Sequence, residues 1–261
     1  MIGIFDSGLG GMTVARAIEQ VCPGYPYLYF GDLVRSPYGP KSPEALLTCA
    51  KRNSDFLIEQ GATILVIACN TAASTAGEAL RDNYSMPFID VVIPAVEKAV
   101  ATTSGRIGVI GTRATIASEI YQRRIEVSRP DSKVYTQPCP LLVPLVEEGW
   151  LKKRETKMIV KKYLHPLRDK QLDTLILGCT HYPLLKKIIV PRIGKKVQLI
   201  DSSIETALAL KKYLENNPEQ SRLLFAPGKQ SRFFVSDLPA HTGNLANMIF
   251  HRPVHLEHVH V

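Results

Sequence analysis

Two cysteines each follow an apolar run and precede side chains that form hydrogen bonds. The two segments read Ala68-Cys69-Asn70-Thr71-Ala72 and Gly178-Cys179-Thr180-His181-Tyr182-Pro183. A thiol has a reference pKa of about 8.5, which a helix N-terminus or a neighbouring imidazole lowers. The adjacent hydroxyl and amide groups can donate to a carboxylate. A single buried cysteine is most often a small hydrophobe, but the same placement twice favours acid/base chemistry at Cys69 and Cys179.

The chain repeats itself around these cysteines. Three segments of the first half return in the second half at nearly constant offsets of 105, 110 and 111 residues. The matching pairs are Ile2–Ile4 with Ile107–Val109, Thr63–Thr71 with Thr174–Thr180, and Phe88–Asp90 with Leu199–Asp201. Three matches in the same order predict two related halves. Because ligands bind at the carboxyl ends of strands in open parallel sheets, two facing sheets would bring Cys69 and Cys179 to opposite walls of one cleft.

The fold class follows from runs of Ile and Val that alternate with stretches of helical period. These runs are apolar throughout, which is typical of parallel strands covered by helices on both faces. The predicted strands are Ile2–Phe5, Pro26–Phe30, Thr63–Ile67, Pro87–Val91, Gly105–Ile110, Lys133–Gln137, Thr174–Leu177 and Lys196–Ile200. We therefore expect an α/β protein of two similar parallel-sheet domains related by internal pseudo-symmetry, with the active site in the cleft between them.

The division between the halves is expected near Pro94, where an apolar strand gives way to a helical pattern. One domain would comprise residues 95–204, and the other residues 1–94 plus 205–261. The tail carries a predicted helix at Glu205–Asn216, a strand at Gln230–Val235 and a helix near Leu245–Phe250. It is too short for a third domain, so we expect it to pack onto the first.

Three further motifs lie where strands end. They are Phe5-Asp6-Ser7-Gly8-Leu9-Gly10-Gly11, the Pro- and Gly-rich loop Gly31–Ser42, and the apolar segment Cys139–Gly149 with its two acids. The first motif has the glycines and the helix start of an anion-binding turn. A helix cap on Asp6 or Ser7 explains it equally well, and it lacks the GxGxxG pattern of a dinucleotide site. Loops such as the second motif often carry binding residues.

Composition excludes several classes of protein. The 261 residues are 45% hydrophobic and 21% charged, as in a globular protein that buries its own core. No apolar run reaches the ~20 residues of a membrane helix. The N-terminus lacks the pattern of a signal peptide, so we expect a cytoplasmic protein. Five widely spaced cysteines without a CxxC pair favour neither a disulfide framework nor a zinc site.

The net charge of +8 is concentrated between Leu151 and Lys196, where 13 Lys and Arg residues accompany three acidic ones. Such a segment fits a nucleic-acid surface. However, paired lysines without interleaved aromatic residues are more typical of solvated helix faces. We therefore expect no nucleic-acid partner.

Taken together, the motifs resemble those of the glutamate racemases in the aspartate/glutamate racemase family. The matching segments are Phe5–Gly11, Pro37–Gly39, Cys69–Thr71, Val143–Gly149 and Gly178–Pro183. The resemblance implies a cofactor-independent isomerase that interconverts L- and D-glutamate and supplies D-glutamate for peptidoglycan synthesis. It implies Cys69 and Cys179 as acid and base. It further implies glutamate binding by Asp6, Ser7, Tyr38, Gly39, Asn70, Thr71, Thr180 and His181.

The residues themselves agree with this mechanism. Racemisation without a cofactor needs a base on one face of Cα and an acid on the other. It also needs donors that stabilise the developing carbanion. By the resemblance, Asp6 assists Cys69, while Glu147 and His181 assist Cys179.

Several alternatives stay open at this point. Glu148, next to Glu147, is a second candidate for the acid, and Leu33-Val34 stand where the family has a small polar residue. A racemase of aspartate or of a hydantoin would share the fold and the thiols but differ in pocket size. A two-domain receptor would explain the repeats but not the paired cysteines. The resemblance also implies a homodimer.

Histidines in the tail offer a further alternative, which is metal binding. They are His251, His255, His258 and His260. No cysteine or acid cluster accompanies them, so an edge strand with outward polar side chains explains them better.

Overall fold

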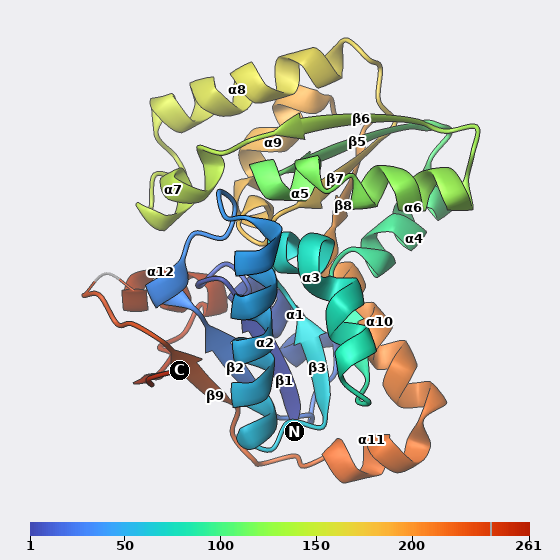
Figure 1. Ribbon diagram of the computed structural model, residues 1–261. Coiled ribbons are helices and arrows are strands. Elements are labelled where there is room, and N and C mark those ends of the chain that lie inside the picture. Colours follow the sequence, from blue (N-terminus) through green and yellow to red (C-terminus); the bar gives the residue numbers. More distant parts are fainter. Residues whose placement is uncertain (241) are drawn as a thin grey trace.

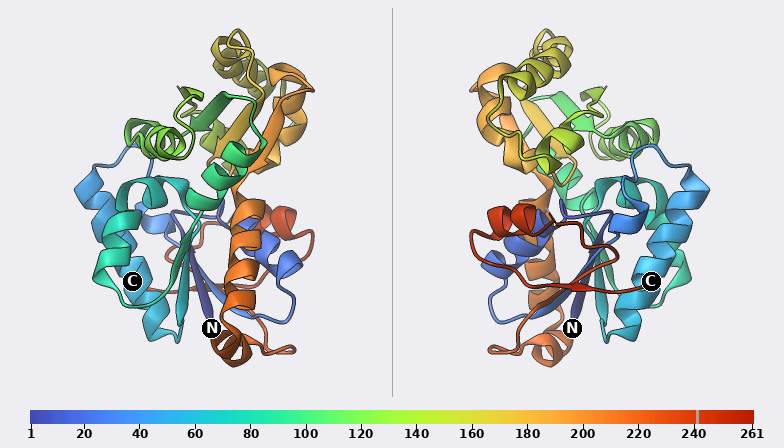
Figure 2. Two further views of the ribbon diagram at one scale, coloured as in Figure 1. Left: turned by 90° about the vertical axis from the view of Figure 1, so that its right-hand side faces the viewer. Right: turned by 90° about the vertical axis from the view of Figure 1, so that its left-hand side faces the viewer.

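The computed structural model describes residues 1–240 and 242–261 and confirms the α/β fold (Figure 1). A first sheet has six strands in the order β10-β9-β2-β1-β3-β4, and a second has four in the order β6-β5-β7-β8. All neighbouring strands in both sheets are parallel. The two views of Figure 2 show the sheets in separate lobes, with both chain termini in the lobe of the first sheet.

The strands form where the apolar runs predict them. The first sheet contains β1 (Ile2–Asp6), β2 (Tyr27–Gly31), β3 (Ile64–Ile67), β4 (Phe88–Asp90), β9 (Arg232–Val235) and β10 (Leu256–His258). The second contains β5 (Arg106–Gly111), β6 (Lys133–Pro138), β7 (Thr174–Gly178) and β8 (Gln198–Asp201). Every residue of β1, β2, β3 and β7 is buried. This explains why these strands are apolar on both faces.

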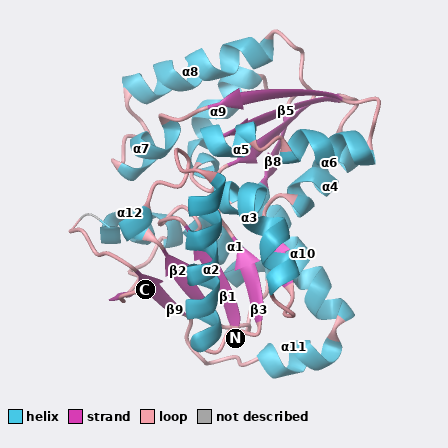
Figure 3. Ribbon diagram, viewed as in Figure 1, coloured by secondary structure: helices cyan, strands magenta, loops and turns pink. Residues whose placement is uncertain are grey.

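Helices connect the strands and flank the sheets (Figure 3). In chain order they are α1 (Met12–Val21), α2 (Pro43–Glu59), α3 (Asn70–Asn83), α4 (Ile93–Thr102), α5 (Arg113–Ala117), α6 (Ile120–Ser128), α7 (Leu142–Glu147), α8 (Arg154–Arg168), α9 (Lys186–Ile193), α10 (Ser202–Asn216), α11 (Pro218–Leu224) and α12 (Thr242–Phe250). The described residues also form two 3-10 turns, η1 (Leu33–Arg35) and η2 (Tyr182–Leu185). None of the helices described is long and apolar enough to cross a membrane.

The internal repeat is visible in the order of the strands. The run β2-β1-β3-β4 of the first sheet corresponds to β6-β5-β7-β8 of the second. In both sheets, the first strand of the half lies between the second and the third. Cys69 follows β3 and Cys179 follows β7, so the two thiols occupy equivalent strand ends.

The C-terminal segment extends the first sheet. β9 pairs with β2, and β10 pairs with β9 at the sheet edge. The sequence pattern did not predict α11. Helix α10 packs against α1 and contacts β4 of the first sheet, and it also contacts β7 and β8 of the second sheet. Because α10 contacts both sheets, the domain boundaries near residues 94 and 204 stay a prediction.

Candidate active site

A cavity of about 360 Å³ lies between the strand ends of the two sheets, and its volume suits a small molecule. Residues that follow β1, β2, β3, β5, β6 and β7 form its walls. Ten of the eleven predicted site residues line it, namely Ser7, Tyr38, Gly39, Cys69, Asn70, Thr71, Glu147, Cys179, Thr180 and His181. The structure therefore brings the motifs of both halves to one place.

Cys69 is the N-cap residue of α3. Its sulfur accepts a hydrogen bond from the backbone N–H of Ala72 at 3.5 Å and donates to Ser7 Oγ at 3.5 Å. Burial, and then the charge of Asp6, raise the pKa of the Cys69 thiol to about 12. A thiol with this pKa is protonated near neutral pH, which is the state of a proton donor.

The second thiol lies beside a buried imidazole. Cys179 Sγ is 3.9 Å from His181 Nδ1, and His181 Nε2 is 3.2 Å from Glu147 Oε1. The latter contact is close enough for an ion pair but is not aligned as a hydrogen bond. Burial lowers the pKa of His181, but the Cys179 sulfur and Glu147 outweigh it and raise this pKa to about 10. An imidazolium at this position stabilises negative charge on the Cys179 sulfur.

The structure distinguishes between the two adjacent acids. Glu147 ends α7 and borders the cavity, next to His181. Glu148 is exposed and is not among the residues described as lining the cavity. The geometry thus places Glu147 at the site.

Asp6 is the one predicted site residue that does not line the cavity. Its carboxylate is fully buried, where Oδ2 accepts from the Gly8 N–H at 3.0 Å and Oδ1 accepts from the Thr180 hydroxyl at 3.4 Å. Burial raises the pKa of Asp6, while the charge of His181 and two backbone N–H groups lower it in part. Asp6 therefore lies behind the cavity wall, hydrogen-bonded to Thr180 of that wall.

The glycine-rich turn after β1 provides close packing. A Cβ on Gly10 would lie 2.4 Å from His181 Cε1 and Nδ1 and 2.5 Å from Thr180 Oγ1. Thr13 strengthens this contact by donating to the Thr180 carbonyl oxygen at 3.0 Å. None of the glycines in this turn adopts a positive φ, and the N-cap residue of α1 is Gly11, which has no side chain to form a cap. The turn thus packs the first half against the Cys179 motif, and neither Asp6 nor Ser7 is the N-cap residue of α1.

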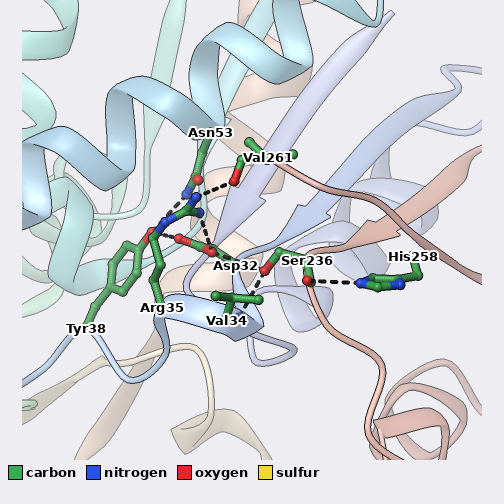
Figure 4. Close-up of polar contacts among 8 residues, drawn as sticks. All are labelled: Asp32, Val34, Arg35, Tyr38, Asn53, Ser236, His258 and Val261. Atoms are coloured by element: carbon green, nitrogen blue, oxygen red, sulfur yellow. Dashed lines mark hydrogen bonds and ion pairs between the residues drawn. The ribbon is translucent and has the colours of Figure 1, made fainter.

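Tyr38 reaches the cavity from a loop that a buried carboxylate organises (Figure 4). Its hydroxyl donates to Asp32 Oδ2 at 2.6 Å and accepts from Asn53 Nδ2 at 3.0 Å. Arg35 forms an ion pair with Asp32 at 2.8 Å and also donates to the backbone oxygen of Val261. Since the hydroxyl is engaged here, a ligand would meet the other atoms of Tyr38.

The C-terminal strands also support this loop. Ser236, which follows β9, donates to Asp32 Oδ1 at 3.1 Å and accepts from the Val34 N–H at 3.0 Å. Its carbonyl oxygen lies 3.2 Å from His258 Nε2 (Figure 4). Across the described residues, no group of three or more potential metal ligands gathers. The metal interpretation of the tail histidines gains no support, and β10 agrees with the edge-strand interpretation.

The cavity also includes residues that the sequence analysis did not select. Among them are Thr112 and Arg113 after β5. Thr112 Oγ1 is 2.9 Å from Thr71 Oγ1, which joins the two halves. Thr112 stands 105 residues after Ser7, the offset of the first repeat, so the repeat carried the signal for it. Nothing in the sequence pattern marked Arg113.

Comparison with known proteins extends these observations. The model of the Asp/Glu/Hydantoin racemase family matches residues 9–210. A glutamate racemase of Persephonella marina is 46% identical over 257 residues, which covers 98% of this chain and 95% of the relative. A solved glutamate racemase from Bacillus anthracis has a TM-score of 0.93 at 35% identity, covering 100% of this chain and 97% of the other. One from Francisella tularensis, in complex with D-glutamate, has a TM-score of 0.91 at 35% identity, covering 99% and 96%.

The fold and the site define an amino-acid racemase, an isomerase. The chain belongs to the Asp/Glu/Hydantoin racemase family. The expectation of an enzyme is thereby confirmed, and the two-domain receptor is set aside.

Proposed function

We propose that this racemase interconverts L- and D-glutamate without a cofactor and supplies D-glutamate for peptidoglycan synthesis in the cytoplasm. One observation carries the proposal: Cys69 and Cys179, from equivalent strand ends of the two halves, line the same cavity. Glutamate as the substrate is supported by the relatives, which are glutamate racemases, one of them solved with D-glutamate.

The reaction from L- to D-glutamate removes a proton from one face of Cα and adds a proton to the opposite face. The Cys179 thiolate takes the Cα proton, and the Cys69 thiol delivers its own proton to the opposite face. One C–H bond breaks as one S–H bond forms, and the reverse happens at the second sulfur, so the two thiols exchange states. The surroundings favour this starting state, because His181 lies beside Cys179 and a raised pKa keeps Cys69 protonated. The reaction from D- to L-glutamate begins from the exchanged state.

The cavity wall supplies groups for a charged substrate. The Asn70 Nδ2 is buried and has no hydrogen-bond partner among the described residues, so it is free to donate to a carboxylate. We propose that the other predicted contacts complete the binding site, with Asp6 attracting the substrate ammonium from behind the wall. The contacts are Ser7, Tyr38, Gly39, Thr71, Thr180 and His181. Preorganised donors of this kind stabilise the negative charge that develops as Cα loses its proton.

A panel of enantiopure substrates followed by circular dichroism tests the proposed function. We expect L- and D-glutamate to lose their signal, and aspartate and hydantoins to keep theirs. Loss of signal with aspartate alone would show that the assigned substrate is wrong. Dialysis against a chelator should leave the rate unchanged, and a loss that zinc restores would contradict cofactor independence.

A further inference from the structure

Tyr121, on α6, lies between the two strand ends that carry the thiols. It is 1% exposed, and its hydroxyl donates to Asn70 Oδ1 at 2.6 Å. Its ring packs against Gly178, where an added Cβ would be 3.4 Å from Tyr121 Cε2. Asn70 directly follows one thiol, and Gly178 directly precedes the other. The buried Tyr121 side chain thus contacts the residue that follows Cys69 and the residue that precedes Cys179.

The Tyr121 hydroxyl determines which end of the Asn70 amide remains free. A primary amide offers an acceptor oxygen at one end and two N–H donors at the other. Burial raises the pKa of Tyr121, so its hydroxyl stays protonated and donates a hydrogen bond to Asn70. Because Oδ1 accepts this hydrogen bond, the end of the Asn70 amide without a partner among the described residues is Nδ2, and Asn70 lines the cavity. A buried donor without a partner is costly, so the amide is prepared for an acceptor from a ligand.

We propose that Tyr121 is a positioning residue, which orients the Asn70 amide so that Nδ2 presents its protons to a carboxylate of the substrate. This inference rests on the proposed function and deepens it. A reversed amide would direct Oδ1 at the carboxylate, and the two oxygens would repel each other. Tyr121 belongs to the second half and Asn70 to the first, so the donor is oriented only while the halves are packed together.

The test replaces Tyr121 with phenylalanine, which keeps the ring on Gly178 and removes only the hydroxyl. We expect the KM for both enantiomers of glutamate to rise about 3- to 10-fold, the range of one net hydrogen bond, with kcat within about twofold of wild type. Tyr27→Phe is the matched control. Tyr27 is equally buried, but its hydroxyl donates to Glu19 at 3.0 Å and it begins β2, at the end of the sheet away from the cavity. Its KM should not change.

A double-mutant cycle with Asn70→Ala shows whether the effect passes through the amide. In the Asn70→Ala background, Tyr121→Phe should change kcat/KM less than about twofold, because the oriented group is gone. An undiminished effect in that background would contradict the proposal, and so would an unchanged KM in the single variant. A purely structural role would lower thermal stability and the active fraction without raising KM.

A measurement on the wild type covers the case in which Tyr121→Phe does not fold. The side-chain amide of Asn70, labelled with 15N, should shift its proton resonances when D-glutamate binds, and unchanged resonances at saturation would overturn the inference. Racemisation by the wild type is measured first. Its absence would contradict the proposed function, whereas normal racemisation with an unchanged KM in Tyr121→Phe contradicts only the role of Tyr121.

Discussion

The imidazole of His181 lies directly against the backbone of Gly10, with no space for a methyl group between them. Two ring atoms are 2.4 Å from the position of a Cβ on residue 10. His181 belongs to the motif of the second half, and Gly10 to the turn after β1 in the first. The first half therefore fixes the ring that lies beside the thiol of the second.

Gly10→Ala should displace this ring and impair both catalysis and stability. Overpacking a filled site costs about 1–3 kcal/mol, and we expect kcat to fall at least ~10-fold because the imidazole leaves Cys179. Gly243→Ala is the control. Gly243 lies in α12 with nothing within 4 Å of an added Cβ, so this change should stabilise by up to ~1 kcal/mol or be neutral. Wild-type kcat in Gly10→Ala would contradict the importance of the contact.

The charge of His181 should make stability depend on pH. Its pKa is about 10 in the folded protein, above the ordinary value of 6.5, so the folded state binds the proton more tightly. The protonated His181 therefore stabilises the folded state; this stabilisation is fully present below about pH 6.5 and is lost as the pH rises through about 10. The difference in free energy of unfolding between wild type and His181→Gln should therefore shrink between pH 7 and 10.

The same titration can be followed directly by NMR of the imidazole Cε1 proton. Glu147→Gln removes one of the negative groups that raise the pKa of His181, so the midpoint should move downward. A wild-type midpoint near pH 6.5, or no movement in Glu147→Gln, would contradict the ion-pair arrangement.

Tyr38→Phe should destabilise the loop that lines the cavity. The change leaves the Asn53 Nδ2 donor and one Asp32 oxygen without the partner they have now. A buried group left unpaired costs about 1–3 kcal/mol, which chemical denaturation would detect. The comparison is Tyr84→Phe, whose hydroxyl donates to exposed Asp55, where we expect less than ~1 kcal/mol. An equal loss of unfolding free energy in the two variants would show that the buried hydrogen bonds of Tyr38 stabilise the fold no more than the exposed one of Tyr84.

The basic segment Leu151–Lys196 should act on the substrate through its field. Lys152, Lys153 and Lys157 are exposed on and just before α8. Changing all three to Glu should raise KM modestly and leave kcat unchanged, and the difference should vanish at high salt, because such a field decays over roughly 8 Å at physiological salt. A nucleic-acid surface would instead bind a labelled oligonucleotide. Tight binding at physiological salt that the triple change abolishes would contradict the solvated-face interpretation.

The sequence predicted the parts of the fold that depend on local pattern. Uniformly apolar runs specified β1, β3 and β7, and the repeat placed Cys69 and Cys179 at equivalent strand ends. The pattern left open how groups meet across the cavity. The choice between Glu147 and Glu148 needed the position of His181, because periodicity reports burial but does not identify a neighbour that is distant in the sequence.

Other features depend on packing alone. The full burial of Asp6 behind the cavity wall follows from how the halves meet. The contact of Tyr121 with Asn70 joins residues 51 positions apart. A tyrosine in an amphipathic helix gives no indication of such a partner, so the sequence alone does not identify Tyr121 as a residue of the site.

Exchange of the Cα hydrogen in D2O tests the two-thiol mechanism most directly. Wild type should exchange and racemise both enantiomers of glutamate. Cys69→Ser and Cys179→Ser should each lose racemisation by at least ~100-fold, because each lacks the acid or base of one face and serine is a poor base near neutral pH. Cys69→Ser should still exchange L-glutamate without inversion, and Cys179→Ser should still exchange D-glutamate. Racemisation above a trace by both single variants would contradict the mechanism.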